Sequence, residues 1–271
     1  MQAGGYYLGA PHMRYLAVAD PAGSTDGPVM HIPAWRKPLW ALFLAPTAWM
    51  VFAPAAQSAD SVGVAGVVAT SLAPAGTFTP EVTERFVRAA QLFEQARAGS
   101  TAAVIPAQEA FKDLLQADSS NPLFVAYYGS TFAMRARDGG APWQKIRWVN
   151  QGIDQIDHAL ALLGPQYDSQ KMRGVPISLE TRLVAIATYV PLPSLFNRMS
   201  VARQELVTAM GSAPFATASD ELRGRFYYED ALIAHADGDM ERERRSLREV
   251  VKYAPPSLDM NEVRQQLAKL P

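Results

Sequence analysis

The fold is decided by residues 224–255, which read GRFYYEDALIAHADGDMERERRSLREVVKYAP. Apolar residues recur three or four positions apart on either side of a central turn, which is the spacing of two helices that each bury one face. Ala231 and Ala234 are small enough to let the second helix approach closely. Gly238 permits the tight turn between the helices, and Pro255 ends the second one. The stretch therefore predicts an antiparallel helix pair.

The same pattern extends outward to both sides of this pair. Phe86, Leu92 and Phe93 begin a series with helical spacing, and no stretch alternates with a period of two for long enough to predict a sheet. Gly and Pro punctuate the series at short intervals. Helices are predicted at residues 79–99, 101–117, 122–137, 142–163, 178–189, 194–210, 220–237, 240–253 and 259–270. The class is all-α, built from antiparallel helix pairs.

The pair at 224–255 resembles a tetratricopeptide repeat (TPR), a unit of about 34 residues. The aromatic, small, glycine, apolar and proline sites of that repeat are occupied by Tyr227, Ala231, Ala234, Gly238, Leu247, Val250 and Pro255. The departure is Glu243, where the family usually has Ala. A partial match has the spacing of the second half of a repeat: Ala110, Leu114, Ala117 and Pro122. The resemblance implies a TPR-like right-handed solenoid whose concave face holds a peptide or another protein.

The first sixty residues have the layout of a secretory leader. Arg36 and Lys37 precede an uncharged apolar stretch at 38–59, and Ser58 and Ala59 flank a cleavage point that follows small residues. We expect cleavage between these two residues. The stretch is close to the length of about 20 residues that a membrane span needs, so an uncleaved anchor is the alternative.

The chain is thus expected to have four parts. Residues 1–29 lack helical or strand periodicity and form a disordered or mis-assigned extension, with Met30 as the natural start. Residues 30–58 form the signal peptide, residues 59–78 a linker, and residues 79–271 the TPR-like helical domain. Export implies a periplasmic protein, or one held at the membrane by the uncleaved leader alone.

Composition excludes several functions. Lys and Arg total 25 against 26 Asp and Glu, for a net charge of -1, so there is no global positive field for a nucleic-acid partner. The chain has no cysteine, which excludes disulfides, thiolate zinc sites, a cysteine nucleophile and lipid attachment to an N-terminal cysteine.

The most distinctive local composition is a cluster of aromatic and basic residues in the middle of the chain. Such residues are frequent at binding hot spots. The predicted partner-binding residues are Tyr127, Tyr128, Arg135, Arg137, Lys145 and Arg147. Trp143 and Trp148 are expected instead to pack between helices. Replacing Arg135 and Arg147 by Glu is expected to abolish capture of a partner.

Two groups of residues suggest chemistry but have plainer explanations. Asp154 and His158 lie one helical turn apart, yet two residues are too few for a metal site. His235, Asp237 and Asp239 are similar to the start of a calcium loop but lack its later ligands, and a repeat turn explains them better. The sequence carries no nucleophile, phosphate-binding or dinucleotide motif, and no cofactor is expected.

The sequence therefore favours an exported, non-enzymatic helical-repeat protein that acts as an adaptor, scaffold or assembly factor in the cell envelope. Its partner would be a protein or peptide. Residues 126–129 and 192–198 resemble bacterial repeat proteins associated with export transporters, so an envelope or transporter component is one candidate. The alternative is a helical-bundle enzyme or small-ligand carrier with a site near Asp154 and His158 or in a pocket between the middle helices.

Overall fold

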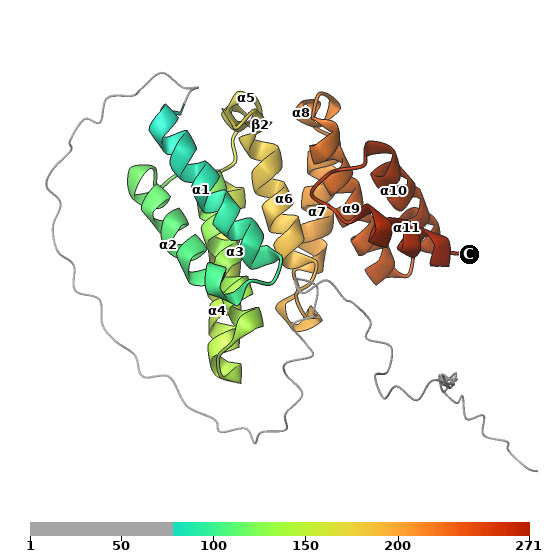
Figure 1. The fold of residues 1–271 in the computed structure, drawn as a ribbon, viewed down its shortest axis with the longest axis horizontal. Helices are drawn as coiled ribbons and strands as arrows, with labels where there is room; N and C mark the ends of the chain where they lie inside the picture. Colours follow the sequence, from blue (N-terminus) through green and yellow to red (C-terminus); the bar gives the residue numbers. More distant parts are fainter. Residues whose placement is uncertain (1–77) are drawn as a thin grey trace, which may run out of the picture. The chain divides into compact units, whose positions relative to one another are not determined.

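The computed structural model of the protein describes residues 78–271 (Figure 1). The predicted extension, the leader with its cleavage point at Ser58 and Ala59, and all but the last residue of the predicted linker lie outside the described residues. Within the described range the chain is mostly helical, with two short strands. The prediction of an all-α class is confirmed.

The long helices lie close to their predicted positions. They are α1 (Pro80–Arg97), α2 (Thr101–Ala117), α3 (Pro122–Asp138), α4 (Pro142–Leu162), α6 (Ile177–Tyr189), α7 (Met199–Met210), α9 (Asp220–Asp237), α10 (Met240–Tyr253) and α11 (Met260–Lys269). The helix predicted at 194–210 is divided into the 3-10 turn η3 (Ser194–Phe196) and α7. Asn197 separates the two with a left-handed backbone, φ 51°, which a continuous helix cannot contain.

Three short features were not predicted. The helices α5 (Gln166–Ser169) and α8 (Ala213–Ala216) lie in connections. The strands β1 (Lys171–Met172) and β2 (Val175–Pro176) pair antiparallel, with Met172 opposite Val175. Their turn is Arg173-Gly174, and both residues have positive φ, 55° and 82°. A two-residue loop of this kind suits a hairpin, but two-residue strands are too short to show a period in the sequence.

Polar residues at the helix starts explain why the helix boundaries were predictable. The Thr79 hydroxyl accepts a hydrogen bond from the Val82 N–H at 3.3 Å, and Asn121 Oδ1 accepts one from the Leu123 N–H at 3.1 Å. Ser219 and Asp259 cap α9 and α11 in the same way. Each such cap contributes about 1 kcal/mol and fixes a boundary through local chemistry.

Successive helices pack as pairs, and the pairs pack on one another (Figure 1). The pairs are α1 with α2, α3 with α4, α6 with α7, and α9 with α10, followed by α11. The first helices also contact one another in sequence: α1 with α3, α3 with α6, and α6 with α9. We call the surface formed by α1, α3, α6 and α9 the first-helix face.

An aromatic cluster joins the first two pairs. The rings of Phe111 and Tyr127 stack with centroids 4.7 Å apart, and Phe93 meets Tyr127 edge-on at the same distance. Phe86 packs edge-on against both Phe111 and Tyr127. Tyr127 is only 2% exposed, so this predicted partner-binding residue has its ring in the core. Such aromatic pairs add to the stability provided by burial alone.

Helices α3 and α4 cross closely at Gly129 and Gly152. A Cβ added at Gly152 would lie 2.7 Å from the Gly129 carbonyl oxygen. The crossing is therefore formed by two glycines, whose missing side chains let the backbones approach. The expectation that both tryptophans pack between helices is wrong for Trp143, which is 72% exposed at the start of α4. Trp148 is half-buried.

The pair at 224–255 packs as its sequence predicts. Ala231 and Ala234 are buried, and Gly238 ends α9 with a left-handed φ of 73°. Gly224 lies against Pro255, where a Cβ would come within 2.7 Å of the proline ring. Glu243, the departure from the repeat pattern, is also buried, and its carboxylate contacts His235 Nδ1 at 3.1 Å. A polar partner thus accommodates the unusual residue at the crossing.

Candidate functional site

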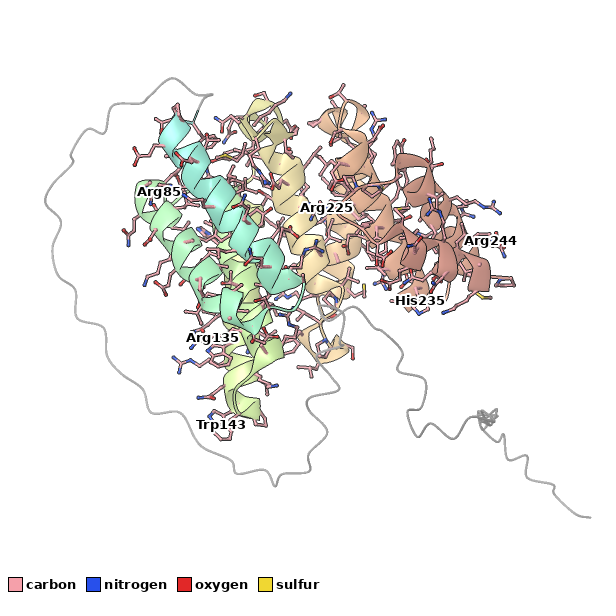
Figure 2. All side chains as sticks on the ribbon, viewed as in Figure 1. Arg85, Arg135, Trp143, Arg225, His235 and Arg244 are labelled. Atoms are coloured by element: carbon pink, nitrogen blue, oxygen red, sulfur yellow. The ribbon has the colours of Figure 1, made fainter. Side chains whose placement is uncertain are left out.

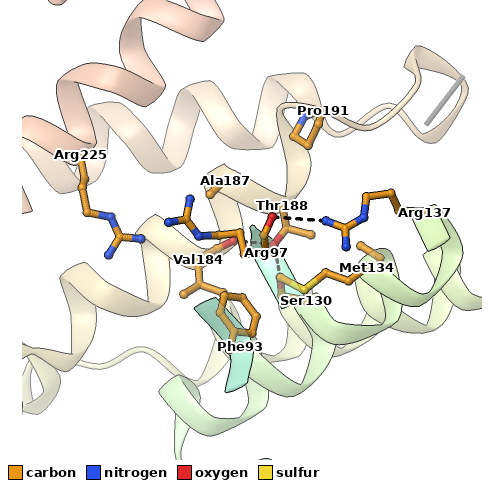
Figure 3. A pocket seen from close by; sticks show the side chains of 11 residues that line it. Phe93, Arg97, Ser130, Met134, Arg137, Val184, Ala187, Thr188, Pro191 and Arg225 are labelled. Carbon is orange, nitrogen blue, oxygen red and sulfur yellow. Dashed lines mark hydrogen bonds between the residues drawn. The ribbon is translucent and has the colours of Figure 1, made fainter. Parts of the chain in front are cut away.

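A pocket lies on the first-helix face, between α1, α3, α6 and α9 (Figure 3). Its volume is about 690 Å³, including space open to solvent. The floor is mainly apolar, and its larger side chains are Phe93, Met134, Val184 and Pro191. Two hydroxyls also line it, and Thr188 donates a hydrogen bond to Ser130 Oγ at 2.8 Å. We call this the arginine pocket because of the three basic side chains that line it.

Arg97, Arg137 and Arg225 reach the arginine pocket from α1, α3 and α9, and none of its lining residues is acidic. Figure 3 shows the Arg97 and Arg225 guanidinium groups on the same side of the pocket. Arg137 donates to the Ala96 carbonyl oxygen at 2.8 Å, which ties α3 to the end of α1. The pocket therefore combines an apolar floor with three positive charges.

The three arginines differ in their partners. Arg97 forms an ion pair with Glu94 at 2.6 Å, and Arg137 pairs with Asp138 at 2.5 Å. For Arg225, the structure of residues 78–271 gives no hydrogen bond and no ion pair within 4.0 Å. Arg225 is half-buried at the edge of the pocket. Its donors are the ones most available to an incoming acceptor.

Arg225 keeps its charge in this setting. Burial by itself would lower the pKa of the guanidinium, but Tyr127, Glu94, Glu180 and Glu221 outweigh that effect by charge interactions. The pKa of Arg225 consequently lies above its ordinary value. A half-buried cation that lacks a direct acceptor attracts anions more strongly than one in open water, because the local dielectric is lower.

A second cavity adjoins the first and shares Arg225 with it. Its volume is about 970 Å³, again including open solvent. The walls are more polar and include Gln91, Gln95, Glu94 and Arg173. Ser257, from the connection between α10 and α11, also lines it. We call this cavity the glutamine pocket.

A buried polar cluster supports the wall of the glutamine pocket. The Tyr127 hydroxyl donates to Glu180 Oε1 at 2.7 Å, and Arg173 donates to the same oxygen at 2.6 Å. Glu180 is 3% exposed. Burial, together with the nearby Glu180 charge, raises the pKa of Tyr127 well above its ordinary value, so the phenol stays neutral. The cluster positions the Arg173 side chain, which also lies over the Phe86 ring at 4.8 Å.

The six residues predicted to bind a partner do not form one surface. Tyr127 lines the glutamine pocket and Arg137 the arginine pocket. The other four lie elsewhere: Tyr128 packs edge-on against Phe132, Arg135 lies over the Trp148 ring at 4.4 Å, Lys145 is 8% exposed, and Arg147 is exposed on α4. Figure 2 shows Arg135 and Arg225 in separate parts of the molecule.

Sequence reasoning missed Arg97, Arg173 and Arg225. Arg97 follows the buried Phe93 by one helical turn, so a basic residue on an otherwise apolar stripe was a usable signal. No comparable signal marked the other two. Arg173 is positioned by an unpredicted hairpin, and Arg225 lies on α9, which has buried residues on several sides.

Asp154 and His158, near which the alternative site is predicted, lie outside the two pockets. Both residues are exposed. Their neighbour Asp157 accepts a hydrogen bond from the Tyr189 hydroxyl at 2.7 Å and pairs with Arg198 at 2.8 Å. Among residues 78–271 there is no group of three or more His, Cys, Asp or Glu side chains placed to hold a metal ion.

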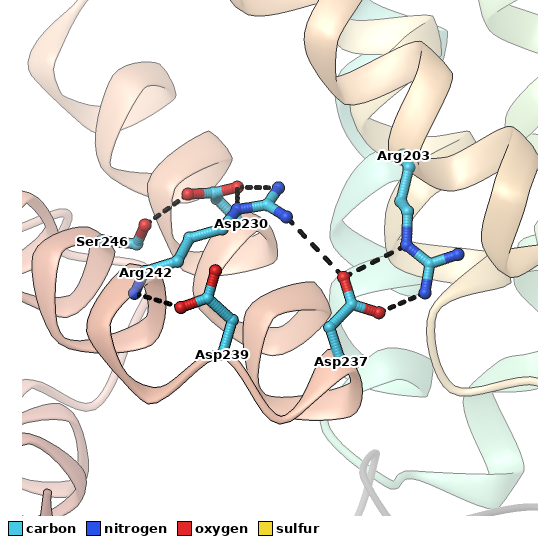
Figure 4. A network of polar contacts seen from close by, with 6 residues as sticks. All are labelled: Arg203, Asp230, Asp237, Asp239, Arg242 and Ser246. Atoms are coloured by element: carbon cyan, nitrogen blue, oxygen red, sulfur yellow. Dashed lines mark hydrogen bonds and ion pairs between the residues drawn. The ribbon is translucent and has the colours of Figure 1, made fainter.

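Of the residues that are similar to a calcium loop, His235 and Asp237 lie in the last turn of α9 and Asp239 in the turn before α10; Figure 4 shows the two aspartates. Asp239 Oδ1 accepts a hydrogen bond from the Arg242 N–H at 3.0 Å and caps α10. Asp237 Oδ2 accepts a hydrogen bond from Arg203 Nε of α7 at 3.2 Å. Arg242 also pairs with Asp230, whose other oxygen accepts a hydrogen bond from Ser246. Asp237 thus joins α9 to the neighbouring α6–α7 pair, whereas Asp230 and Asp239 hold α9 and α10 together.

Within residues 78–271, no helix is both long enough and apolar enough to cross a bilayer. Comparisons with models of protein families, with curated proteins and with solved structures gave no significant match.

Proposed function

We propose that this protein is a non-catalytic helical-repeat adaptor whose first-helix face is the concave face of a TPR-like right-handed solenoid. On this proposal the concave face binds an acidic segment of a partner protein. The observation that carries the proposal is Arg225, a half-buried cation without a direct acceptor among the described residues, in a pocket lined by two further arginines and no carboxylate.

Charge complementarity supports an acidic occupant. A carboxylate that reaches Arg225 would gain charge-assisted hydrogen bonds, which contribute about 1.5–3 kcal/mol each when partly buried. A cationic occupant would instead find three arginines and no carboxylate in the lining of the pocket. The apolar floor formed by Phe93, Met134 and Val184 supplies a second source of affinity, because a side chain placed there leaves water.

The compartment is part of the proposal. The leader predicted at residues 30–58 would export the chain, and the adaptor would then act in the periplasm on an envelope or transporter component. The arginine pocket also suits the second candidate, a carrier of a small anion with an apolar body, because its arginines lie beside an apolar floor. Such a ligand would occupy the arginine pocket and leave the glutamine pocket empty.

A random seven-residue peptide library displayed on phage tests the proposal. Selection on the immobilised full-length protein is expected to enrich acidic peptides. The same selection on an Arg97→Gln/Arg225→Gln variant is expected to lose them. Gln is chosen over Glu because Arg225 lies near Glu94, Glu180 and Glu221, and a fourth acidic side chain would destabilise the fold.

Two controls separate this face from other surfaces. Arg88→Gln removes a charge from the exposed side of α1, and Arg147→Gln tests the surface favoured by sequence alone. Both variants should retain the wild-type peptides. The proposal is overturned if no peptide is enriched, if the double variant enriches the same peptides, or if only Arg147→Gln loses them.

A further inference from the structure

The two pockets adjoin along α1. The glutamine pocket is lined from Val87 to Gln95 and the arginine pocket by Phe93 and Arg97, so together they follow α1 from residue 87 to residue 97. Ten helical residues correspond to about 15 Å. An extended polypeptide advances about 3.3 Å per residue, so about five residues of such a chain would cover this length.

The chemistry along this length changes from one end to the other. Gln91 and Gln95 are exposed one turn apart on α1, and their side-chain amides both donate and accept hydrogen bonds. Peptide backbone has the same mixture of donors and acceptors. The arginine pocket, at the other end, has an apolar floor beside the guanidinium groups of Arg97 and Arg225.

We infer that the occupant is an extended segment of about five residues in which an apolar and an acidic side chain are separated by one residue. This inference rests on the proposed function. In an extended chain, side chains i and i+2 point to the same face, whereas i and i+1 point to opposite faces. Because the apolar floor and the arginines belong to one pocket, both side chains must point into it together.

The roles of the arginines in this segment's recognition are distinct. Arg225 is the primary hydrogen-bond donor to the carboxylate, since it has no direct partner among the described residues. Arg97 is already paired with Glu94, so it contributes a second donor at the edge of the site. Arg137 holds the end of α1 through the Ala96 carbonyl and thereby fixes the position of Arg97.

The inference is tested with synthetic fluorescein-labelled peptides that carry one Leu and one Glu in a nine-residue Gly/Ser background. One peptide separates Leu and Glu by one residue, and its partner of equal composition places them side by side. Fluorescence anisotropy with the full-length protein should show the separated peptide binding at least about tenfold more tightly. Arg225→Gln should remove this preference, and Arg88→Gln should retain it.

The apolar contact is tested by Ala187→Trp, which fills the arginine pocket without changing its charge. This variant should bind the separated peptide about tenfold more weakly than the wild type does, and its affinity for the peptide with adjacent Leu and Glu should be unchanged. Circular dichroism on every variant identifies one that has lost its fold. If Ala187→Trp does not fold, Ala187→Leu replaces it and should lose part of the affinity for the separated peptide. If Arg225→Gln does not fold, Arg225→Lys replaces it and should retain the preference for the separated peptide.

The outcomes separate the inference from the proposal beneath it. If both peptides bind equally and both depend on Arg225, the spacing inference is wrong and the proposed acidic partner remains. If neither binds and the phage selection enriches nothing, the proposed function also fails. Equal binding to the wild type and to Arg225→Gln places the site elsewhere and overturns both.

Discussion

Replacing Gly152 by Ala is predicted to destabilise the protein, although alanine is the better helix former. A Cβ at residue 152 would lie 2.7 Å from the Gly129 carbonyl oxygen and 3.3 Å from Phe132 Cβ. The first contact involves backbone, so no side-chain rotation relieves it, and α3 and α4 must separate. Alanine gains about 1 kcal/mol of helix propensity over glycine, whereas overpacking costs about 1–3 kcal/mol.

Because the clash is with backbone, we place the cost at or above the upper end of that range and predict a net loss of about 2 kcal/mol. For a domain of this size, that loss lowers Tm by about 4–8 °C. Thermal unfolding followed by circular dichroism at 222 nm measures the change. Gly139→Ala is the matched control, because a Cβ there meets nothing within 4 Å and the backbone is extended, with φ -171°.

The control should change the free energy of unfolding by no more than about 0.5 kcal/mol. A Gly152→Ala variant as stable as wild type would refute the reasoning, since it would mean that the α3–α4 crossing is wider than described. Equal destabilisation by both variants would show that loss of a glycine, and not the crossing, is responsible.

Four further predictions concern polar groups and the leader. The pKa of Tyr127 is raised above 10.0, so the stability that its neutral phenol contributes is present below pH 10 and is lost as pH rises through the folded-state pKa. The urea midpoint of the wild type should therefore fall above pH 10, and Tyr127→Phe should make this fall smaller. An unchanged fall in the variant would contradict the assignment. Asp230→Asn should cost about 1.5–3 kcal/mol in urea unfolding, because the side chain is 13% exposed and bonded by Arg242 and Ser246. Asp237→Asn should cost less than about 1 kcal/mol, since its pair with Arg203 is more exposed; the reverse order would contradict this ranking. Mass spectrometry of the exported protein should find Ala59 at its N-terminus, and a mature chain that still contains Ser58 would exclude the predicted cleavage.

The helices were predictable because their signals are local. Thr79, Asn121, Ser219 and Asp259 cap helices through residues two or three positions away, and Gly238 ends α9 through its own backbone conformation. Because these interactions are local, the residues around each helix boundary are enough to predict it. The hairpin at Arg173 escaped prediction because two-residue strands show no periodicity.

The candidate site could be predicted only in part. Tyr127 and Arg137 are among the predicted partner-binding residues, and they line the two pockets. The other predicted residues are close to them in the sequence but do not line either pocket. Arg225 and Arg97 belong to α9 and α1, far apart in the sequence, and only the packing of α1, α3, α6 and α9 brings them to one pocket. Neither composition nor periodicity contains that information.

The most direct test of the account is a double-mutant cycle between Arg225 and the acidic residue of the bound peptide. Affinities are measured for wild type and Arg225→Gln against the Leu-x-Glu peptide and its Glu→Gln counterpart. Direct contact predicts a coupling free energy of about 1–3 kcal/mol, as for contacting charged groups. A coupling below about 0.3 kcal/mol, with both single changes additive, would show that the carboxylate does not bind at Arg225 and would contradict the account.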